Sequence, residues 1–271
     1  MKIGVYGCGW LGLPLALKLK SAGHSIVATR RSEEAVRELL TLGFAAIPFT
    51  LGDTLSSERL QPLFASELII LNIPPGRKSI QAHIFAAHMT DLVEAIAIKS
   101  NAKLIFISTS SVYGNTSGNI TEQTPVSPTS DSGKAHVLIE QAIFEQFENR
   151  ACVIRLTGLV GKNRHPAKHL AGRTGIPNGQ HAVNLVHQLD VINAIQQIIN
   201  HNVWGQTLHL CSTEHPSRED YYRWAATKLG LPTPEFIAEK NAENGKQIDA
   251  RSSIEKLGLN LQYPSPFDML S

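Results

Sequence analysis

The 271-residue chain has few cysteines and aromatic residues, no long apolar run and almost no net charge. Its three cysteines, Cys8, Cys152 and Cys211, lie far apart, which argues against a disulfide framework and favours free thiols in a reducing cytoplasm. No stretch approaches the ~20 apolar residues that cross a bilayer. Lys and Arg number 25 against 23 Asp and Glu, a formal net charge of +2 that provides no basic field for nucleic acid. We therefore expect a cytoplasmic protein whose partner is a small-molecule substrate, with neither nucleic acid nor membrane involved.

What the chain does contain is a regular succession of short apolar runs. Hydrophobic residues make up 42% of it, enough for one large domain or for one domain with a small lobe. Helical patterns separate the runs, which lie at residues 2–6, 24–29, 45–49, 68–72, 103–108, 151–156 and 207–212. Strands that are apolar throughout and alternate with helices are typical of a parallel sheet covered on both faces. The predicted fold class is α/β, a Rossmann-type doubly wound parallel sheet with a small C-terminal α+β lobe.

The composition changes after Gly161. Residues 162–180 are rich in Gly, Pro, His and Asn, and the residues after 213 form short helical patterns separated by Pro. We predict an NAD(P)-binding Rossmann domain and a small substrate-binding lobe. Their ranges are 1–161, with 183–212 returning to the same domain, and 162–182 with 213–271.

A glycine fingerprint follows the first apolar run directly. In it, Gly7 allows a tight turn, Gly9 leaves room for the backbone to approach a phosphate, and Gly12 lets the next helix pack against the strand. The phosphate of a dinucleotide then meets unpaired N–H groups at the start of that helix. The predicted cofactor-binding residues of this loop are Gly7, Gly9, Trp10, Leu11 and Gly12.

The end of the second apolar run indicates which nicotinamide cofactor binds. An acidic residue there would bind the free 2′-hydroxyl of the adenosine ribose. This chain instead has Arg30, Arg31 and Ser32. A planar guanidinium can donate two parallel hydrogen bonds to a phosphate. We therefore predict NADP, with NAD the less favoured cofactor.

Four later segments carry a resemblance to a known family. Thr109-Ser110-Ser111-Val112-Tyr113-Gly114 follows the fifth run, and Ser130-Asp131-Ser132-Gly133-Lys134 follows two prolines; the other two segments span 155–161 and 183–191. Together they resemble the extended short-chain dehydrogenase/reductase superfamily, in its NAD(P)-dependent epimerase/dehydratase branch, over most of the chain. The resemblance implies an oxidoreductase or epimerase that acts on a carbonyl or hydroxyl of a sugar-like or nucleotide-linked small molecule.

The same resemblance implies roles for individual residues. Thr109 would hydrogen-bond the reacting oxygen of the substrate, and Lys134 would reach the nicotinamide ribose and lower the pKa of a tyrosine four residues before it. Ser130 occupies that tyrosine position, and a serine hydroxyl does not ionise near neutral pH, whereas a phenol with a pKa of about 10 can be brought into range. The predicted catalytic residues are thus Thr109, Ser130 and Lys134, and the substitutes considered for the missing phenol are Tyr113, His136 and His187. Ile73, Pro74, Ser108 and Lys134 complete the predicted cofactor site.

Three residues are expected to meet the substrate, namely Tyr113, Arg164 and His165. His165 and His169 have a spacing that could bind a metal on a helix, but Pro166 between them disfavours a helix, and we assign no metal.

Two other functions stay open. The glycine fingerprint and the Arg pair also resemble the opening of the hydroxyacid dehydrogenases, although nothing after Gly161 offers their long helical second domain. The missing tyrosine favours an NADP(H)-binding sensor that has lost catalysis. The superfamily resemblance further implies a homodimer formed by helices near residues 79–100 and 134–147.

Overall fold

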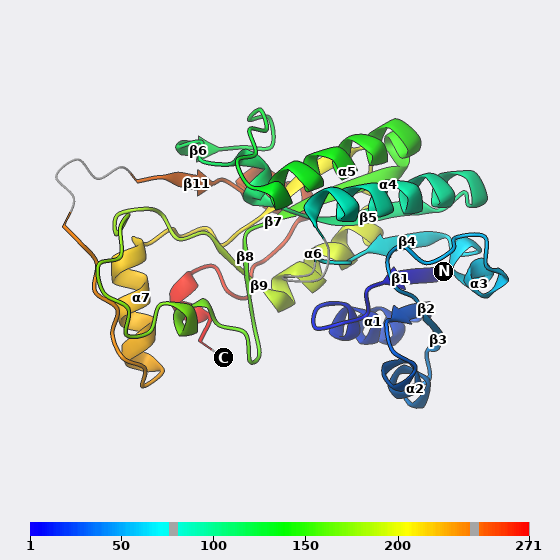
Figure 1. Cartoon of the computed structure of the whole chain (residues 1–271), viewed down its shortest axis with the longest axis horizontal. Helices are drawn as coiled ribbons and strands as arrows, with labels where there is room; N and C mark the ends of the chain where they lie inside the picture. The colour runs from blue at the N-terminus through cyan, green and yellow to red at the C-terminus, as the bar shows by residue number, and fades with distance from the viewer. Residues whose placement is uncertain (76–80, 239–243, 271) are drawn as a thin grey trace. The chain divides into compact units, whose positions relative to one another are not determined.

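The structure is a computed structural model that describes residues 1–75, 81–238 and 244–270 (Figure 1). Its strands are β1 Lys2–Tyr6, β2 Ser25–Arg30, β3 Ala45–Pro48, β4 Leu68–Leu71, β5 Lys103–Thr109, β6 Gly118–Ile120, β7 Ala151–Leu156, β8 Gly158–Val160, β9 Leu185–His187, β10 Gln206–Leu210 and β11 Lys246–Ile248. Its α-helices are α1 Gly12–Ser21, α2 Glu33–Thr41, α3 Gln61–Phe64, α4 Ala82–Lys99, α5 Asp131–Phe147, α6 Gln188–Asn200, α7 Arg218–Lys228 and α8 Arg251–Leu257. Within the described residues, no helix combines the length and the apolar character needed to cross a membrane.

Seven strands form one sheet in the order β10-β7-β5-β4-β1-β2-β3. β1 pairs in parallel with β2 and β4, β2 pairs with β3, and β4 pairs with β5. The strand order reverses direction beside β1, which is the arrangement that places a ligand site at the carboxyl ends of the central strands. The predicted α/β fold with a doubly wound parallel sheet is confirmed.

The seven strands of the sheet coincide with the seven apolar runs of the sequence, within one or two residues at each end. Sequence reasoning missed the strands of two small sheets, which pair β6 with β11 and β8 with β9. These strands have three residues each. Such short segments carry too little periodicity to stand out from loops.

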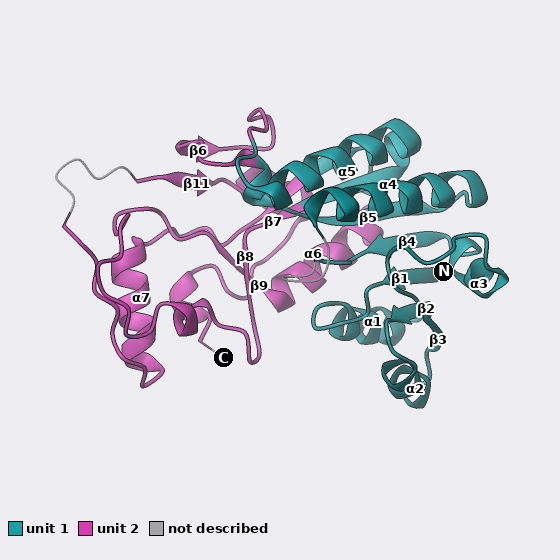
Figure 2. Cartoon of the chain, in the orientation of Figure 1, with its two compact units in different colours: residues 1–112, 128–154, 202–207 teal, residues 113–127, 155–201, 208–271 magenta. Residues whose placement is uncertain are grey.

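The chain divides into two compact units (Figure 2). Unit 1 comprises residues 1–112, 128–154 and 202–207, and unit 2 comprises residues 113–127, 155–201 and 208–271. These ranges differ from the predicted domain boundaries, because the units interleave three times along the chain. The assignment of one part to the cofactor and the other to the substrate stays a prediction.

Unit 1 contains the glycine fingerprint, and a large buried cluster of this unit lies on one face of the sheet. Side chains from alternate positions of the strands, such as Ile69 and Leu71 of β4, join Phe85 of α4 and Ile139 of α5 in one buried cluster. α4 and α5 pack side by side over this cluster (Figure 1). Because the strands are buried on both faces, the sheet is rigid, and its loop ends can hold ligand groups in fixed positions.

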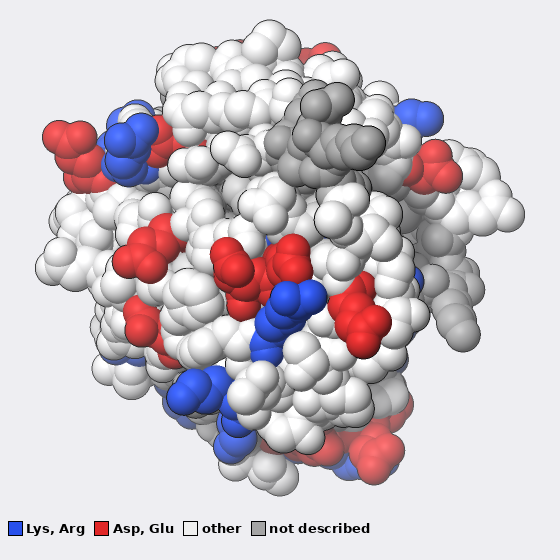
Figure 3. All heavy atoms as spheres, turned by 90° about the vertical axis from the view of Figure 1, so that its left-hand side faces the viewer, with Lys and Arg blue, Asp and Glu red and all other residues white. Residues whose placement is uncertain are grey.

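Unit 2 has its own smaller cluster, built around Tyr221 of α7. Its ring lies 5.2 Å from the Tyr222 ring, 6.1 Å from the Trp224 ring and 5.9 Å from the Phe267 ring. Figure 3 views the left-hand side of Figure 1 and shows acidic and basic side chains mixed on this face. α7 illustrates the mixture, because an Arg223–Glu219 ion pair of 2.9 Å lies along it.

Candidate functional site

In the loop between β1 and α1, two of the three glycines pack tightly against neighbouring carbonyl groups, and the third faces open space. Gly7 has a φ of +87°, and a Cβ there would lie 2.3 Å from the Asn72 carbonyl oxygen. A Cβ on Gly12 would lie 2.4 Å from the Gly7 carbonyl oxygen, whereas a Cβ on Gly9 would meet nothing within 4 Å. The backbone at Gly9 therefore faces open space, as an approaching phosphate requires.

The start of α1 is suited to an anion. Leu11 occupies the N-cap position, and no side chain caps the helix there. The first N–H groups of a helix lack partners within the helix, and the helix dipole favours negative charge beside them. The fingerprint thus fits a dinucleotide pyrophosphate, which would lie over Gly9 and the first turn of α1.

Side chains at the end of β2 and directly after β4 hold this loop in place. The Gly7 N–H donates to Thr29 Oγ1 at 3.0 Å, and Asn72 Nδ2 donates to the Gly7 carbonyl at 3.0 Å. Arg30 Nη1 donates to the Cys8 carbonyl at 2.7 Å. Sequence reasoning missed Thr29 and Asn72, although each is a polar residue that ends or follows an apolar strand, and that position was the available signal.

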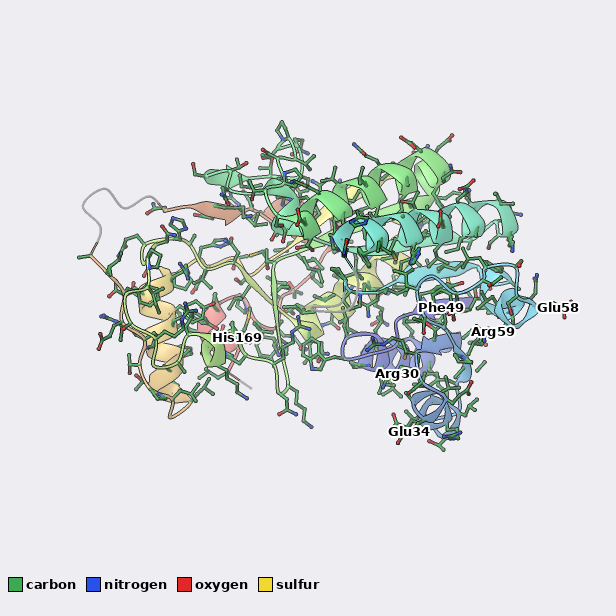
Figure 4. All side chains as sticks on the ribbon, in the orientation of Figure 1. Arg30, Glu34, Phe49, Glu58, Arg59 and His169 are labelled. Carbon is green, nitrogen blue, oxygen red and sulfur yellow. The ribbon has the colours of Figure 1, made fainter. Side chains whose placement is uncertain are left out.

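The basic residues at the end of β2 have different surroundings. Arg30 is engaged with the loop, and its Nη2 lies 3.9 Å from Glu38 of α2, with 29% of its side chain exposed. Arg31 is exposed. Ser32 caps α2, since its Oγ accepts from the Ala35 N–H at 3.3 Å. Figure 4 marks Arg30 at this strand end together with Glu34 in the first turn of α2. Arg31 is therefore the guanidinium that is free of the loop and open to solvent.

Three further predicted cofactor residues lie at the ends of β4 and β5. Ile73 and Pro74 follow the loop-binding Asn72, and Ile73 packs against the core of unit 1. Ser108 is buried, and its hydroxyl donates to Glu140 of α5 at 2.5 Å. Ser108 thus has a partner on α5, which the sequence did not indicate.

Thr109 ends β5 and lies in a small hydroxyl pair. Its Oγ1 is 2.9 Å from Ser111 Oγ and accepts from the Ser111 N–H at 3.2 Å. Both residues are only partly buried, so their hydroxyl groups can reach a ligand at the carboxyl end of the sheet.

Ser130 and Lys134 lie at the start of α5. Ser130 is the N-cap of α5, and its Oγ accepts from the Gly133 N–H at 3.1 Å. The Lys134 side chain is 60% exposed, with Nζ 3.8 Å from Asp131. The geometry gives Ser130 a capping role and leaves Lys134 on the solvent side of the helix. Their assignment to the reaction stays a prediction.

The three predicted substrate residues all belong to unit 2, and two of them are buried. Tyr113 Oη receives a hydrogen bond from Arg155 at 2.6 Å and lies 2.6 Å from His209 Nε2. His165 Nδ1 accepts from the Ala167 N–H at 3.2 Å, and its Nε2 lies 3.0 Å from Tyr221 Oη. Only Arg164 is exposed.

Comparison with known proteins places this geometry in a family. The model of the NAD dependent epimerase/dehydratase family matches residues 3–211, which include the glycine loop, Thr109 and α5. The chain belongs to the NAD dependent epimerase/dehydratase family. Protein YeeZ of Escherichia coli K12 is 31% identical over 270 residues, covering 99% of this chain and 98% of the relative. The predicted membership of the epimerase/dehydratase branch is confirmed. The same motifs also indicate a bacterial YeeZ-like protein, and the match to Protein YeeZ confirms this prediction.

Solved structures of other proteins share the fold. UDP-glucuronic acid 4-epimerase from Bacillus cereus in complex with NAD has a TM-score of 0.79 and 21% identity, covering 100% of this chain and 96% of that one. The Bordetella bronchiseptica enzyme WbmH in complex with NAD+ has a TM-score of 0.80 and 15% identity, covering 99% of this chain and 95% of that one. Because the family model matches residues 3–211, the hydroxyacid dehydrogenase alternative is dropped. The structure agrees, because the longest described helix of unit 2, α6, has 13 residues and forms no long helical second domain.

Proposed function

We propose that this protein binds NADP(H) on the loop between β1 and α1 and catalyses an oxidoreductase or epimerase reaction on a sugar-like or nucleotide-linked molecule. The observation that carries the proposal is the open face at Gly9, between two glycines packed against neighbouring carbonyls. When bound, the cofactor supplies a hydride acceptor or donor. The residues of the chain bind and orient the reactants, and Thr109 is proposed to hydrogen-bond the reacting oxygen.

Preference for NADP over NAD is supported by the end of β2. The two epimerase-family structures compared above hold NAD. In this chain Arg31 is exposed beside the Ser32 cap of α2, so a guanidinium is available for a 2′-phosphate. Arg30 supports the loop itself and would serve either cofactor.

Calorimetric titration with NADPH and NADH tests this preference. We expect tighter binding of NADPH, and Arg31→Ala weakens NADPH binding about tenfold while leaving NADH binding unchanged, since one charge-assisted hydrogen bond is lost. Arg30→Ala weakens binding of both, because the Cys8 carbonyl loses its donor. Arg37→Ala, at the exposed arginine of α2, is the control. Equal or tighter binding of NADH to the wild type contradicts the preference.

The proposed substrate class rests on the family and on the exposed Arg164, which can meet an anionic group. A turnover screen over sugar nucleotides and simple carbonyls, with the cofactor followed by absorbance, is the direct test.

An NADP(H) sensor is the second candidate. The capping hydrogen bond of Ser130 favours the sensor, because this hydroxyl stabilises the start of α5 instead of taking the catalytic position. Binding of NADPH without consumption in the screen would select the sensor over the enzyme.

We also propose a cytoplasmic location. The three free cysteines are buried, which supports this proposal.

The proposed homodimer would use α4 and α5, whose Ile98 and Leu138 are 74% and 54% exposed. Residues 79 and 80 of the predicted first helix lie outside the described residues. Sedimentation of wild type and Leu138→Lys measures whether a dimer forms and whether this face holds it.

A further inference from the structure

The inward face of α5 carries titratable groups that the family resemblance does not use. Gly133 lies so close to the end of β5 that a Cβ there would be 2.6 Å from the Ser111 carbonyl oxygen. His136 and Glu140 follow at helical spacing and are 5% and 4% exposed. Lys134 lies about half a turn away from these residues and faces solvent. The buried face of α5, which meets the end of β5 at Gly133 and Ser111, therefore presents His136, not Lys134.

The His136 ring is fixed in position and tautomer. It lies 5.9 Å from the Phe106 ring of β5 and 5.8 Å from the Phe85 ring of α4. Its Nδ1 is 2.7 Å from the Ser132 carbonyl oxygen. A carbonyl only accepts, so Nδ1 carries the proton and Nε2 is the basic nitrogen. This bond to the preceding turn directs the ring toward the start of α5, where Gly133 meets the end of β5.

A buried carboxylate lies one turn further along the same face. Glu140 accepts from Ser108 at 2.5 Å, and its charge favours a protonated His136. The residues that pack on the ring from the other elements, Phe85 and Phe106, are uncharged. Burial nevertheless lowers the pKa of His136, so the ring is neutral near pH 7. A base held neutral, with a carboxylate ready to stabilise its charged form, has the properties of a proton acceptor.

We infer that His136 is the proton-carrying side chain of this site, filling the role for which the family pattern provides a phenol. The inference rests on the proposed function and deepens it. The hydroxyl O–H bond of a bound alcohol breaks and an N–H bond forms at His136 Nε2. The imidazolium is stabilised by Glu140, and the oxyanion is hydrogen-bonded by Thr109. In the opposite direction the same proton returns to the oxygen.

Long-range ¹H–¹⁵N spectra of the histidine side chains test the inference without turnover. The wild type should show His136, assigned from its loss in His136→Asn, as the Nδ1–H tautomer at pH 7, and its signals should move when NADPH is added. A proton on Nε2, or no response to bound NADPH, overturns the inference. Calorimetry on the same samples separates the two failures, because a wild type that binds neither nucleotide refutes the proposed function instead.

Kinetics on a substrate found by the screen provide the second readout. Asn places its amide nitrogen near the position of Nδ1, so His136→Asn can keep the bond to Ser132 while losing the basic nitrogen. We expect kcat to fall about 100-fold, with the low-pH limb of its pH profile abolished and NADPH affinity unchanged. His83→Gln, at an exposed histidine of α4, is the matched control and keeps the wild-type profile. An unchanged profile in His136→Asn, or abolition of that limb by Lys134→Gln instead, contradicts the inference.

Discussion

At the scale of single residues, each of the three glycines of the loop between β1 and α1 is explained by a different physical reason. Gly7 is required by its positive φ and by the Asn72 carbonyl, and Gly12 by the Gly7 carbonyl. Gly9 has neither constraint, and its Cβ position is empty. Its absence of a side chain therefore concerns the ligand and not the fold.

Gly9→Ala should consequently separate binding from stability. We expect the free energy of unfolding of Gly9→Ala to lie within about 1 kcal/mol of the wild-type value, since alanine fits the free space. NADPH affinity should fall at least tenfold, because the methyl group obstructs the pyrophosphate. Gly7→Ala should lose both NADPH affinity and stability, and strain at positive φ should lower its free energy of unfolding by more than about 1 kcal/mol. Urea unfolding and calorimetry measure the two effects. Full NADPH affinity in Gly9→Ala would place the phosphate elsewhere.

At the scale of elements, side chains near helix starts tie separate segments together. Asp190, in the first turn of α6, accepts from the Gln262 N–H at 2.7 Å and from the Tyr263 N–H at 3.1 Å. The Tyr263 ring also lies 3.7 Å from the His187 ring at the N-cap of α6. One buried carboxylate thus fixes the C-terminal segment of unit 2 to α6.

Asp190→Ala should release that segment. The two N–H groups lose their acceptor, which costs about 1–3 kcal/mol for each group that stays buried. Asp190→Asn keeps one acceptor oxygen and should lose less. Hydrogen exchange at residues 262 and 263 is the measurement, and we expect faster exchange in the order wild type, Asn, Ala. Equal protection in all three variants would show that other contacts hold the segment.

At the scale of the whole molecule, both units bury histidines in neutral form. Burial is the main cause that lowers the pKa of His136 in unit 1 and of His165, His209 and His215 in unit 2. A histidine whose pKa is lower in the folded state takes up protons more readily when unfolded. Its contribution to stability is present above the unfolded pKa of about 6.5 and is lost as the pH falls through the folded value.

The free energy of unfolding should therefore be nearly constant between about pH 7 and pH 8 and fall progressively below about pH 6.5. Urea titrations at half-unit intervals of pH measure it. Replacing the exposed His83 with Gln should leave this profile unchanged, whereas His136→Asn should flatten part of the fall. A stability that rises on acidification would contradict the buried neutral state of these histidines.

The sequence alone determined the sheet, the glycine loop after its first strand and the family, because apolar runs and glycine spacing act over a few neighbouring residues. The helix after Ser130 was also recognisable, but which of its polar residues turn inward was not. That choice depends on how α5 is rotated about its axis against β5. Lys134 lies on the opposite face from the buried stripe of the helix, which is formed by Ala135, Ile139, Ile143 and Phe147. Only the tertiary structure packed the His136 ring against Phe106 of β5, and buried Tyr113 and His165, since burial depends on segments distant in the chain.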